Sequence, residues 1–301
     1  MSGVEPVNML NQLRVREAMR KVAASIPAAA PIEQLIRCTL KNKVNAILVT
    51  EARFKPVGVV SRTDVMAAYY SGISVESPVS MIMCGPVIFC GIDDSLETAL
   101  TVMRENRISR VYTQTEEPGG TVGVISYPDI VGLLYRYCHK CERNIFRSRK
   151  SPAAGEEDFF RVKEVMTPVL MHGEDETLLE VMESLSGGYI GAVAIADKRG
   201  APVGVVSKTD LILAYRHGIP ATERAGTVMA SPVRSCDENE ELAKAIQTMI
   251  FSDLQRLFVH RDAPAAIVGM ISLADAARTR SGSCRACVPS RISPESLAPG
   301  I

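Results

Sequence analysis

The sequence lacks a surplus of charge of either sign, because 34 Lys and Arg residues balance 34 Asp and Glu residues. A protein that binds nucleic acid regardless of sequence needs a basic surplus to displace counterions, so we expect no nucleic-acid partner. No apolar run approaches the roughly 20 residues of a membrane helix. Residues 1–13 also lack the charged-then-apolar pattern of a secretory signal. These absences predict a cytoplasmic protein without a membrane partner.

Familiar catalytic motifs are absent as well. The sequence has no P-loop, no Gly-x-Ser-x-Gly elbow and no His-Glu-x-x-His pattern. Its histidines are scattered and do not accompany a recurring nucleophile: His139, His172, His217 and His260. We therefore expect that the protein is not an enzyme.

The clearest positive feature is an internal repeat. A motif of Gly, two apolar residues, Ser, two variable residues and Asp occurs at residues 58–64, 123–129, 204–210 and 269–275. Copies within a half are 65 residues apart, and equivalent copies in the two halves are 146 apart. With 301 residues, 47% of them apolar, the chain is long enough for about two globular domains. These spacings indicate that the chain is a duplicated pair of repeats.

Each repeat shows the same order of elements. Residues 95–106 and 238–251 carry apolar side chains at helical spacing, and short apolar runs at 46–49 and 56–60 are typical of strands. Pro86 and Pro232 suit the first position of a short leading strand. The unit is β-α-β-β-α, an α/β (α+β) fold, and we place it at residues 13–72, 78–141, 160–218 and 225–287. Residues 142–159 form a predicted linker, and residues 288–301 a predicted flexible tail.

The Ser-x-x-Asp part of the motif has two interpretations. A serine followed three residues later by an acid forms a capping box, in which each side chain satisfies a free backbone N–H at the helix start. The same strand-to-helix turn also presents N–H groups to an anion, and a nearby carboxylate can hold the hydroxyls of a ribose. Arg62 and Lys208 add a cation to this turn in the first and third repeats, whereas the second and fourth have Tyr127 and Leu273.

The four β-α-β-β-α units, each ending in this motif, resemble the cystathionine-β-synthase (CBS) domain, which pairs into Bateman modules. Four repeats without another domain are similar in organisation to the gamma subunit of AMP-activated protein kinase. The resemblance implies two Bateman modules in a disc with pseudo-twofold symmetry, formed by one chain or by a homodimer. It also implies a ligand that contains adenosine (AMP, ADP, ATP, or S-adenosylmethionine or a dinucleotide) in clefts between paired repeats.

The resemblance assigns roles to individual residues. The motif's aspartates hold the ribose and its serines assist: Ser61, Asp64, Ser126, Asp129, Ser207, Asp210, Ser272 and Asp275. Arg110 and Arg256 match a basic position that reaches phosphates, although an Arg at a strand start is more often solvated. The equivalent positions in the first and third repeats are Ala46 and Ala192. We therefore expect two phosphate-binding sites rather than four.

Each half has one Cys-x-x-Cys pair after its last predicted helix. The pairs are Cys138 with Cys141 and Cys284 with Cys287. Together they supply the four thiolates of a zinc site or an iron–sulfur cluster. Nearby basic residues also suit a redox switch, and four plain surface cysteines are the remaining alternative. The other cysteines are predicted to lie in or near the core: Cys38, Cys84, Cys90 and Cys236.

Two functions follow. The first is a regulatory module that binds AMP, ADP or ATP and signals to a regulated protein. The alternative is a metal-binding or thiol-redox protein that uses the CBS repeats as a scaffold.

Overall fold

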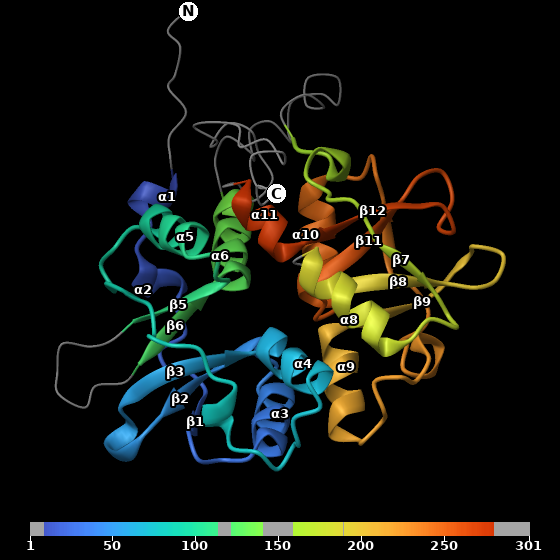
Figure 1. Ribbon diagram of the computed structural model, residues 1–301. Coiled ribbons are helices and arrows are strands. Elements are labelled where there is room, and N and C mark those ends of the chain that lie inside the picture. Colours follow the sequence, from blue (N-terminus) through green and yellow to red (C-terminus); the bar gives the residue numbers. More distant parts are fainter. Residues whose placement is uncertain (1–8, 114–121, 141–158, 189, 280–301) are drawn as a thin grey trace, which may run out of the picture.

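The computed structural model describes residues 9–113, 122–140, 159–188 and 190–279, and these form four repeats around a common centre (Figure 1). Each repeat has a three-stranded sheet in which the first strand is parallel and the third antiparallel to the middle strand. The first half contains α1 (Met9–Gln12), α2 (Val15–Ala18), β1 (Ser25–Pro27), α3 (Ile32–Lys41), β2 (Ala46–Thr50), β3 (Pro56–Ser61), α4 (Arg62–Tyr70), β4 (Phe89–Cys90), α5 (Leu96–Glu105), β5 (Arg110–Thr113), β6 (Gly123–Ser126) and α6 (Tyr127–Lys140). The second half contains β7 (Met171–Gly173), α8 (Leu178–Gly187), β8 (Ala192–Ala196), β9 (Pro202–Ser207), α9 (Lys208–Arg216), β10 (Ser235–Asp237), α10 (Leu242–Phe251), β11 (Arg256–His260), β12 (Ile267–Ser272) and α11 (Leu273–Arg278).

The predicted β-α-β-β-α unit is confirmed, with small errors at its boundaries. Helix α5 begins directly after Ser95, whose hydroxyl accepts a hydrogen bond from the N–H of Thr98. Helix α10 begins at Leu242 and not at Glu238, because residues 238–241 form the turn that follows β10. The leading strands β4 and β10 each begin three residues after Pro86 and Pro232, so neither proline is the first strand residue.

Within each half, the sheets of two repeats pack face to face. In the first half, Ala23, Leu48 and Tyr112 form a small buried cluster between the two sheets. In the second half, Ala192, Ala194, Phe258 and Met270 form the equivalent cluster. We call these halves the first and second modules. Since the inner strand faces of both sheets are apolar, burial of this surface holds each pair together.

Helices join the two modules. Helix α4 packs against α9, so the first repeat faces the third, and α6 packs against α11, so the second faces the fourth. The rings of Tyr69 and Tyr215 stack across the first of these contacts with centroids 5.1 Å apart. Their hydroxyls donate to the carbonyls of Ile219 and Ile73, respectively. Because the two large apolar cores each take residues from both modules, the duplicated halves form one disc.

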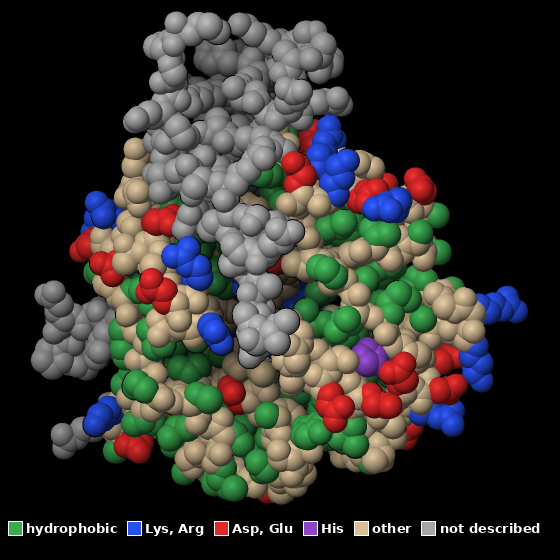
Figure 2. All heavy atoms as spheres, turned by 45° about the horizontal axis from the view of Figure 1, so that its top comes forward, with side chains coloured by type: hydrophobic (Ala, Val, Ile, Leu, Met, Phe, Trp, Pro, Cys, Tyr) green, Lys and Arg blue, Asp and Glu red, His purple; other side chains and the backbone are tan. Residues whose placement is uncertain are grey.

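The surface agrees with the balanced composition. On the face shown in Figure 2, basic and acidic side chains of the described residues are interspersed rather than separated by sign. Among the described residues, no helix combines the length and the apolar character needed to cross a membrane. The predicted tail and all of the predicted linker except Phe159 lie outside the described residues.

Candidate functional site

The four Ser-x-x-Asp motifs form the predicted helix caps. In each copy the serine N–H and hydroxyl both donate to Oδ2 of the aspartate three residues later. The N–H to Oδ2 distances lie between 2.7 Å for Ser61 and 3.0 Å for Ser126. Two hydrogen bonds from the serine to one carboxylate oxygen fix the aspartate at the start of the helix. Oδ2 is therefore fully engaged in the cap, and Oδ1 is the oxygen left for a ligand.

The surroundings of Oδ1 differ among the four copies. The Cys84 thiol lies 3.6 Å from Oδ1 of Asp64, and Oδ1 of Asp210 accepts no hydrogen bond from a described residue. Arg20 Nε donates to Oδ1 of Asp129 at 2.9 Å. Arg278 Nη1 donates to Oδ1 of Asp275 at 3.2 Å. Four positions that are equivalent in sequence are thus unequal as acceptors for a ribose.

Arg62 and Lys208 begin helices α4 and α9 and cross between the modules. Arg62 Nη1 donates to Thr209 Oγ1 at 2.6 Å, and Lys208 Nζ donates to Thr63 Oγ1 at 2.9 Å. Each cation therefore reaches the first turn of the opposite helix. These two hydrogen bonds hold both positive charges at the junction of the first and third repeats.

Arg110 and Arg256 extend from the starts of β5 and β11 toward the neighbouring repeat of their own module. Arg110 Nη1 donates to the carbonyl of Ala46 at 3.1 Å. The Arg256 guanidinium lies directly on Gly191, where a Cβ atom would overlap its nitrogens. The alternative that these arginines are simply solvated does not describe either residue, because both are partly buried against the adjoining repeat.

These side chains, Arg62, Arg110, Lys208 and Arg256, form what we call the central cation cluster. Burial lowers the pKa of Arg62, and the charge of Arg110 lowers it further. Burial and the charge of Arg62 lower the pKa of Arg256 to about 10, although Asp275 and Asp210 favour its charged form. Burial, together with Arg256, lowers the pKa of Lys208 to about 8. Like charges withdrawn from water in this way favour a bound anion.

Two nitrogens of the cluster have no hydrogen-bond partner in the described part of the chain. Arg62 Nε and Arg256 Nη1 are inaccessible to water and have no hydrogen-bond partner among the described residues. Leaving a buried donor on a charged group unpaired costs free energy. A phosphate group, with several acceptor oxygens and negative charge, would satisfy such donors and offset the repulsion.

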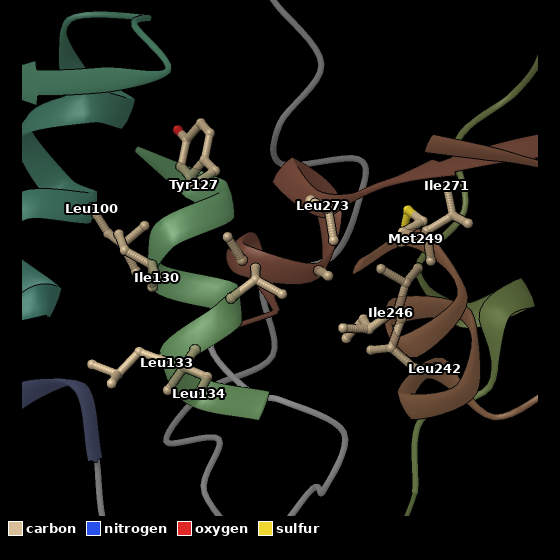
Figure 3. Close-up of a cluster of buried hydrophobic side chains, with 14 of the residues drawn as sticks. Leu100, Tyr127, Ile130, Leu133, Leu134, Leu242, Ile246, Met249, Ile271 and Leu273 are labelled. Atoms are coloured by element: carbon tan, nitrogen blue, oxygen red, sulfur yellow. The ribbon is translucent and has the colours of Figure 1, made fainter. Parts of the chain in front are cut away.

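The second and fourth repeats contribute no cation at the equivalent turn. Tyr127 and Leu273 are buried in the apolar core where α6 meets α11 and α10 (Figure 3). The Arg278 guanidinium carbon lies 5.5 Å from the centroid of the Tyr127 ring. The predicted alternation between basic and apolar residues therefore corresponds to two different environments on opposite sides of the disc.

A cavity of about 260 Å³ lies between the paired repeats of the first module, where the family resemblance implies a ligand cleft. Asp129, Ser126 and Arg110 of the predicted set line it, together with Arg20 and Gln255. Gln255 belongs to the second module and accepts a hydrogen bond from Asn45 Nδ2 at 2.6 Å. The involvement of Arg20 and Gln255 depends on chain segments far apart in sequence, and no local motif marks either residue.

The Cys-x-x-Cys prediction falls largely outside the described residues. Cys138 lies on helix α6, and Cys141, Cys284 and Cys287 are not described. No group of three or more His, Cys, Asp or Glu residues within the described ranges is arranged to hold a metal ion. Of the other cysteines, Cys236 is buried and Cys38 and Cys90 are partly buried. The prediction is wrong for Cys84, which is exposed because it lies on a loop that joins β3 only through an isolated backbone bridge with Val59.

Comparison with known sequences gives four matches to one family. The family model of the CBS domain matches residues 15–71, 79–136, 162–217 and 225–282. An uncharacterized protein from Methanocaldococcus jannaschii is 28% identical over 160 residues, which are 52% of this chain. The chain spans only 37% of that relative's length.

Solved structures show the same arrangement of four repeats. A protein from Methanocaldococcus jannaschii, described as a candidate archaeal homologue of γ-AMPK, superposes with a TM-score of 0.71 at 18% identity. The match covers 88% of this chain and 99% of that one. An uncharacterized conserved protein from Pyrococcus horikoshii has a TM-score of 0.56 at 18% identity, covering 89% and 100% of the two chains. These similarities show the fold.

Proposed function

The chain belongs to the CBS-domain family, and from this premise we propose that it is a non-catalytic regulatory module that binds AMP, ADP or ATP between its repeats. Binding would change how the two modules are held together, and a separate protein would respond to that change. The central cation cluster is the observation that carries this proposal, because its charges are partly buried, close together and incompletely paired. A phosphate complements such a cluster, because it brings negative charge and several acceptor oxygens.

The ribose position adjoins the phosphate position in this proposal. Asp64 is close enough to Lys208 to stabilise its positive charge, and Asp210 does the same for Arg62. A nucleotide whose ribose hydroxyls bond to Oδ1 of either aspartate would therefore direct its phosphates toward a cation from the opposite module. Since the cluster takes residues from both modules, a phosphate there would link them.

The positive charge of the cluster also predicts which adenosine ligands bind more tightly. S-adenosylmethionine carries a sulfonium cation, which the four positive side chains would repel. AMP, ADP and ATP bring negative charge into the same volume. We therefore expect phosphate-bearing adenosine ligands to bind and adenosine or S-adenosylmethionine to bind much more weakly.

A thermal-shift panel with adenosine, AMP, ADP, ATP and S-adenosylmethionine tests this function. A ligand at 100 times its dissociation constant stabilises the folded state by about 2.7 kcal/mol. For a domain of about 150 residues, which is roughly half of this chain, that free energy corresponds to a rise of roughly 5–10 °C in Tm. We expect a rise with AMP, ADP or ATP and a far smaller one with adenosine. A response to adenosine equal to that of AMP would contradict a role for the cluster.

Aspartate variants then locate the site. Asp64→Asn and Asp210→Asn keep an acceptor for the helix cap and remove the negative charge, so they disturb the helix start less than alanine would. We expect each to lower AMP affinity while the Tm of the ligand-free protein changes little. Asp197→Asn, in the exposed turn between β8 and β9, is the matched control. Unchanged AMP binding in the Asp64→Asn, Asp210→Asn double variant would overturn the proposed function.

A further inference from the structure

The cavity of the first module combines the features of a nucleotide cleft with an obstruction. Its 260 Å³ are bounded by the motif residues Ser126 and Asp129, by Arg110 of the central cluster and by the apolar side chains of Ala46 and Val124. Polar and apolar side chains both line this cavity, and the polar groups that converge on it can orient a small molecule. The carboxylate that would receive a ribose, however, already has a partner.

That partner is Arg20. Its Nε lies 2.9 Å from Oδ1 of Asp129, and its backbone is paired with Val124 on the neighbouring strand. The Asp129 side chain is only 11% exposed, whereas the Arg20 side chain is 50% exposed. The guanidinium therefore covers the one carboxylate oxygen that the helix cap leaves available.

The second module shows that an arginine is not needed at this place. The backbone bridge between Arg20 and Val124 has its counterpart in the bridge between Thr167 and Met270. Thr167 donates its hydroxyl to the carbonyl of Met270, and no hydrogen bond joins it to Asp275, the motif aspartate of the fourth repeat, among the described residues. Arg20 is therefore a feature of the first module and not of the fold.

We propose that Arg20 is a gate that keeps the Asp129 cleft from accepting a nucleotide. This inference rests on the proposed function, because it concerns the same class of ligand. In the ligand-free protein the Arg20–Asp129 pair occupies the position of the ribose hydroxyls. A nucleotide must first break a charge-assisted hydrogen bond to a largely buried carboxylate, which is among the stronger bonds in proteins.

The gate accounts for unequal sites within one disc. Oδ1 of Asp210 accepts no hydrogen bond from a described residue, and Oδ1 of Asp64 accepts one only from the Cys84 thiol, which is a weak donor. Both copies have a cation at the adjoining turn, so these two copies bind nucleotide. Asp129 faces Arg20, and Asp275 faces Arg278 from its own helix. The protein therefore binds two nucleotides, and the Asp129 cleft is the latent third site, because the Arg20 side chain is half exposed and has room to turn toward solvent.

Titration calorimetry with AMP tests the gate on the full chain. Arg20→Thr installs the residue that the second module carries at the equivalent position. We expect two AMP per chain for the parent and three for Arg20→Thr, with the new site at least ~10-fold tighter than any residual binding there in the parent. Arg16→Thr, which removes an arginine from an exposed ion pair with Asp93, is the matched control and should keep two.

A second variant assigns the extra site. Adding Asp129→Asn to Arg20→Thr should return the stoichiometry to two. Equal AMP binding by the parent and Arg20→Thr would overturn the gate and leave the proposed function standing, as would weaker binding by Arg20→Thr. If neither the parent nor Arg20→Thr binds AMP, ADP or ATP, both the gate and the proposed function are wrong.

Discussion

Replacing Lys208 by Met should stabilise the ligand-free protein and weaken nucleotide binding. Lys208 carries a charge that burial and Arg256 disfavour, and its pKa falls from 10.5 to about 8. A shift of this size corresponds to roughly 3 kcal/mol against the charged form in the folded state. Methionine keeps most of the apolar volume of the side chain without the charge.

The net effect is smaller than the full shift. The variant loses the hydrogen bond from Nζ to Thr63 Oγ1, which contributes about 1 kcal/mol. The expected gain at neutral pH is therefore about 2 kcal/mol, or roughly 5 °C in Tm. For AMP, loss of a charge-assisted hydrogen bond should reduce affinity by about 10- to 100-fold.

The pH dependence separates this explanation from a general effect on packing. Because the folded-state pKa of Lys208 lies below its unfolded value, the unfolded protein binds more protons between about pH 8 and about pH 10.5. The stability of the parent should therefore gain a contribution as pH rises through this window, whereas the variant gains none from this residue. Their difference in Tm should be largest near pH 7 and shrink toward pH 10.

Differential scanning fluorimetry from about pH 7 to about pH 10, with calorimetric AMP titration near pH 7, measures both effects. Lys198→Met is the matched control, since Lys198 is 80% exposed and forms only a surface ion pair with Asp175. A lower Tm for Lys208→Met near pH 7, or a difference that does not change with pH, would refute the argument that Lys208 is a desolvated cation.

Two further predictions concern the neighbours of the cluster. Gly191→Ala should displace the Arg256 guanidinium and reduce AMP affinity. Gly187→Ala is the control, because its added Cβ meets no atom within 4 Å, and it should leave AMP affinity unchanged. Calorimetric titration of both variants with AMP checks this prediction. AMP should protect Cys84 from alkylation, because the thiol lies 3.6 Å from Oδ1 of Asp64. Burial and Asp64 raise the pKa of this thiol, so alkylation should be slow near neutral pH and accelerate as pH rises. Peptide mapping by mass spectrometry measures the modification, and equal labelling with and without AMP would contradict a ligand at Asp64.

Much of the repeat architecture could be predicted because it depends on local sequence. The helix beginning after Ser95 was anticipated from the spacing of Leu96, Ala99, Leu100 and Met103, and all four side chains are buried. The errors at Glu238, Pro86 and Pro232 fall where a turn precedes an element. At these points local propensity is weak and neighbouring strands decide where hydrogen bonding begins.

The candidate site was only partly accessible to sequence reasoning. The four serine–aspartate pairs were found because a cap involves residues three apart, and the cations at Arg62 and Lys208 were found because they lie inside the same motif. Arg20 and Gln255 were missed. Their partners, Asp129 and Asn45, are 109 and 210 residues away along the chain.

The sequence by itself determined the fourfold repeat, the family and the position of each aspartate at a helix start, since short-range hydrogen bonds reproduce the same turn wherever the motif occurs. The packing between repeats sets what meets Oδ1 of three of the four aspartates: a thiol at Asp64, an arginine at Asp129, and no described donor at Asp210. The same packing brings Arg62 to Thr209 and Lys208 to Thr63, so each cation donates a hydrogen bond to the opposite module. The physical reason is that burial and long-range charge depend on packing between repeats, which identical motifs do not encode.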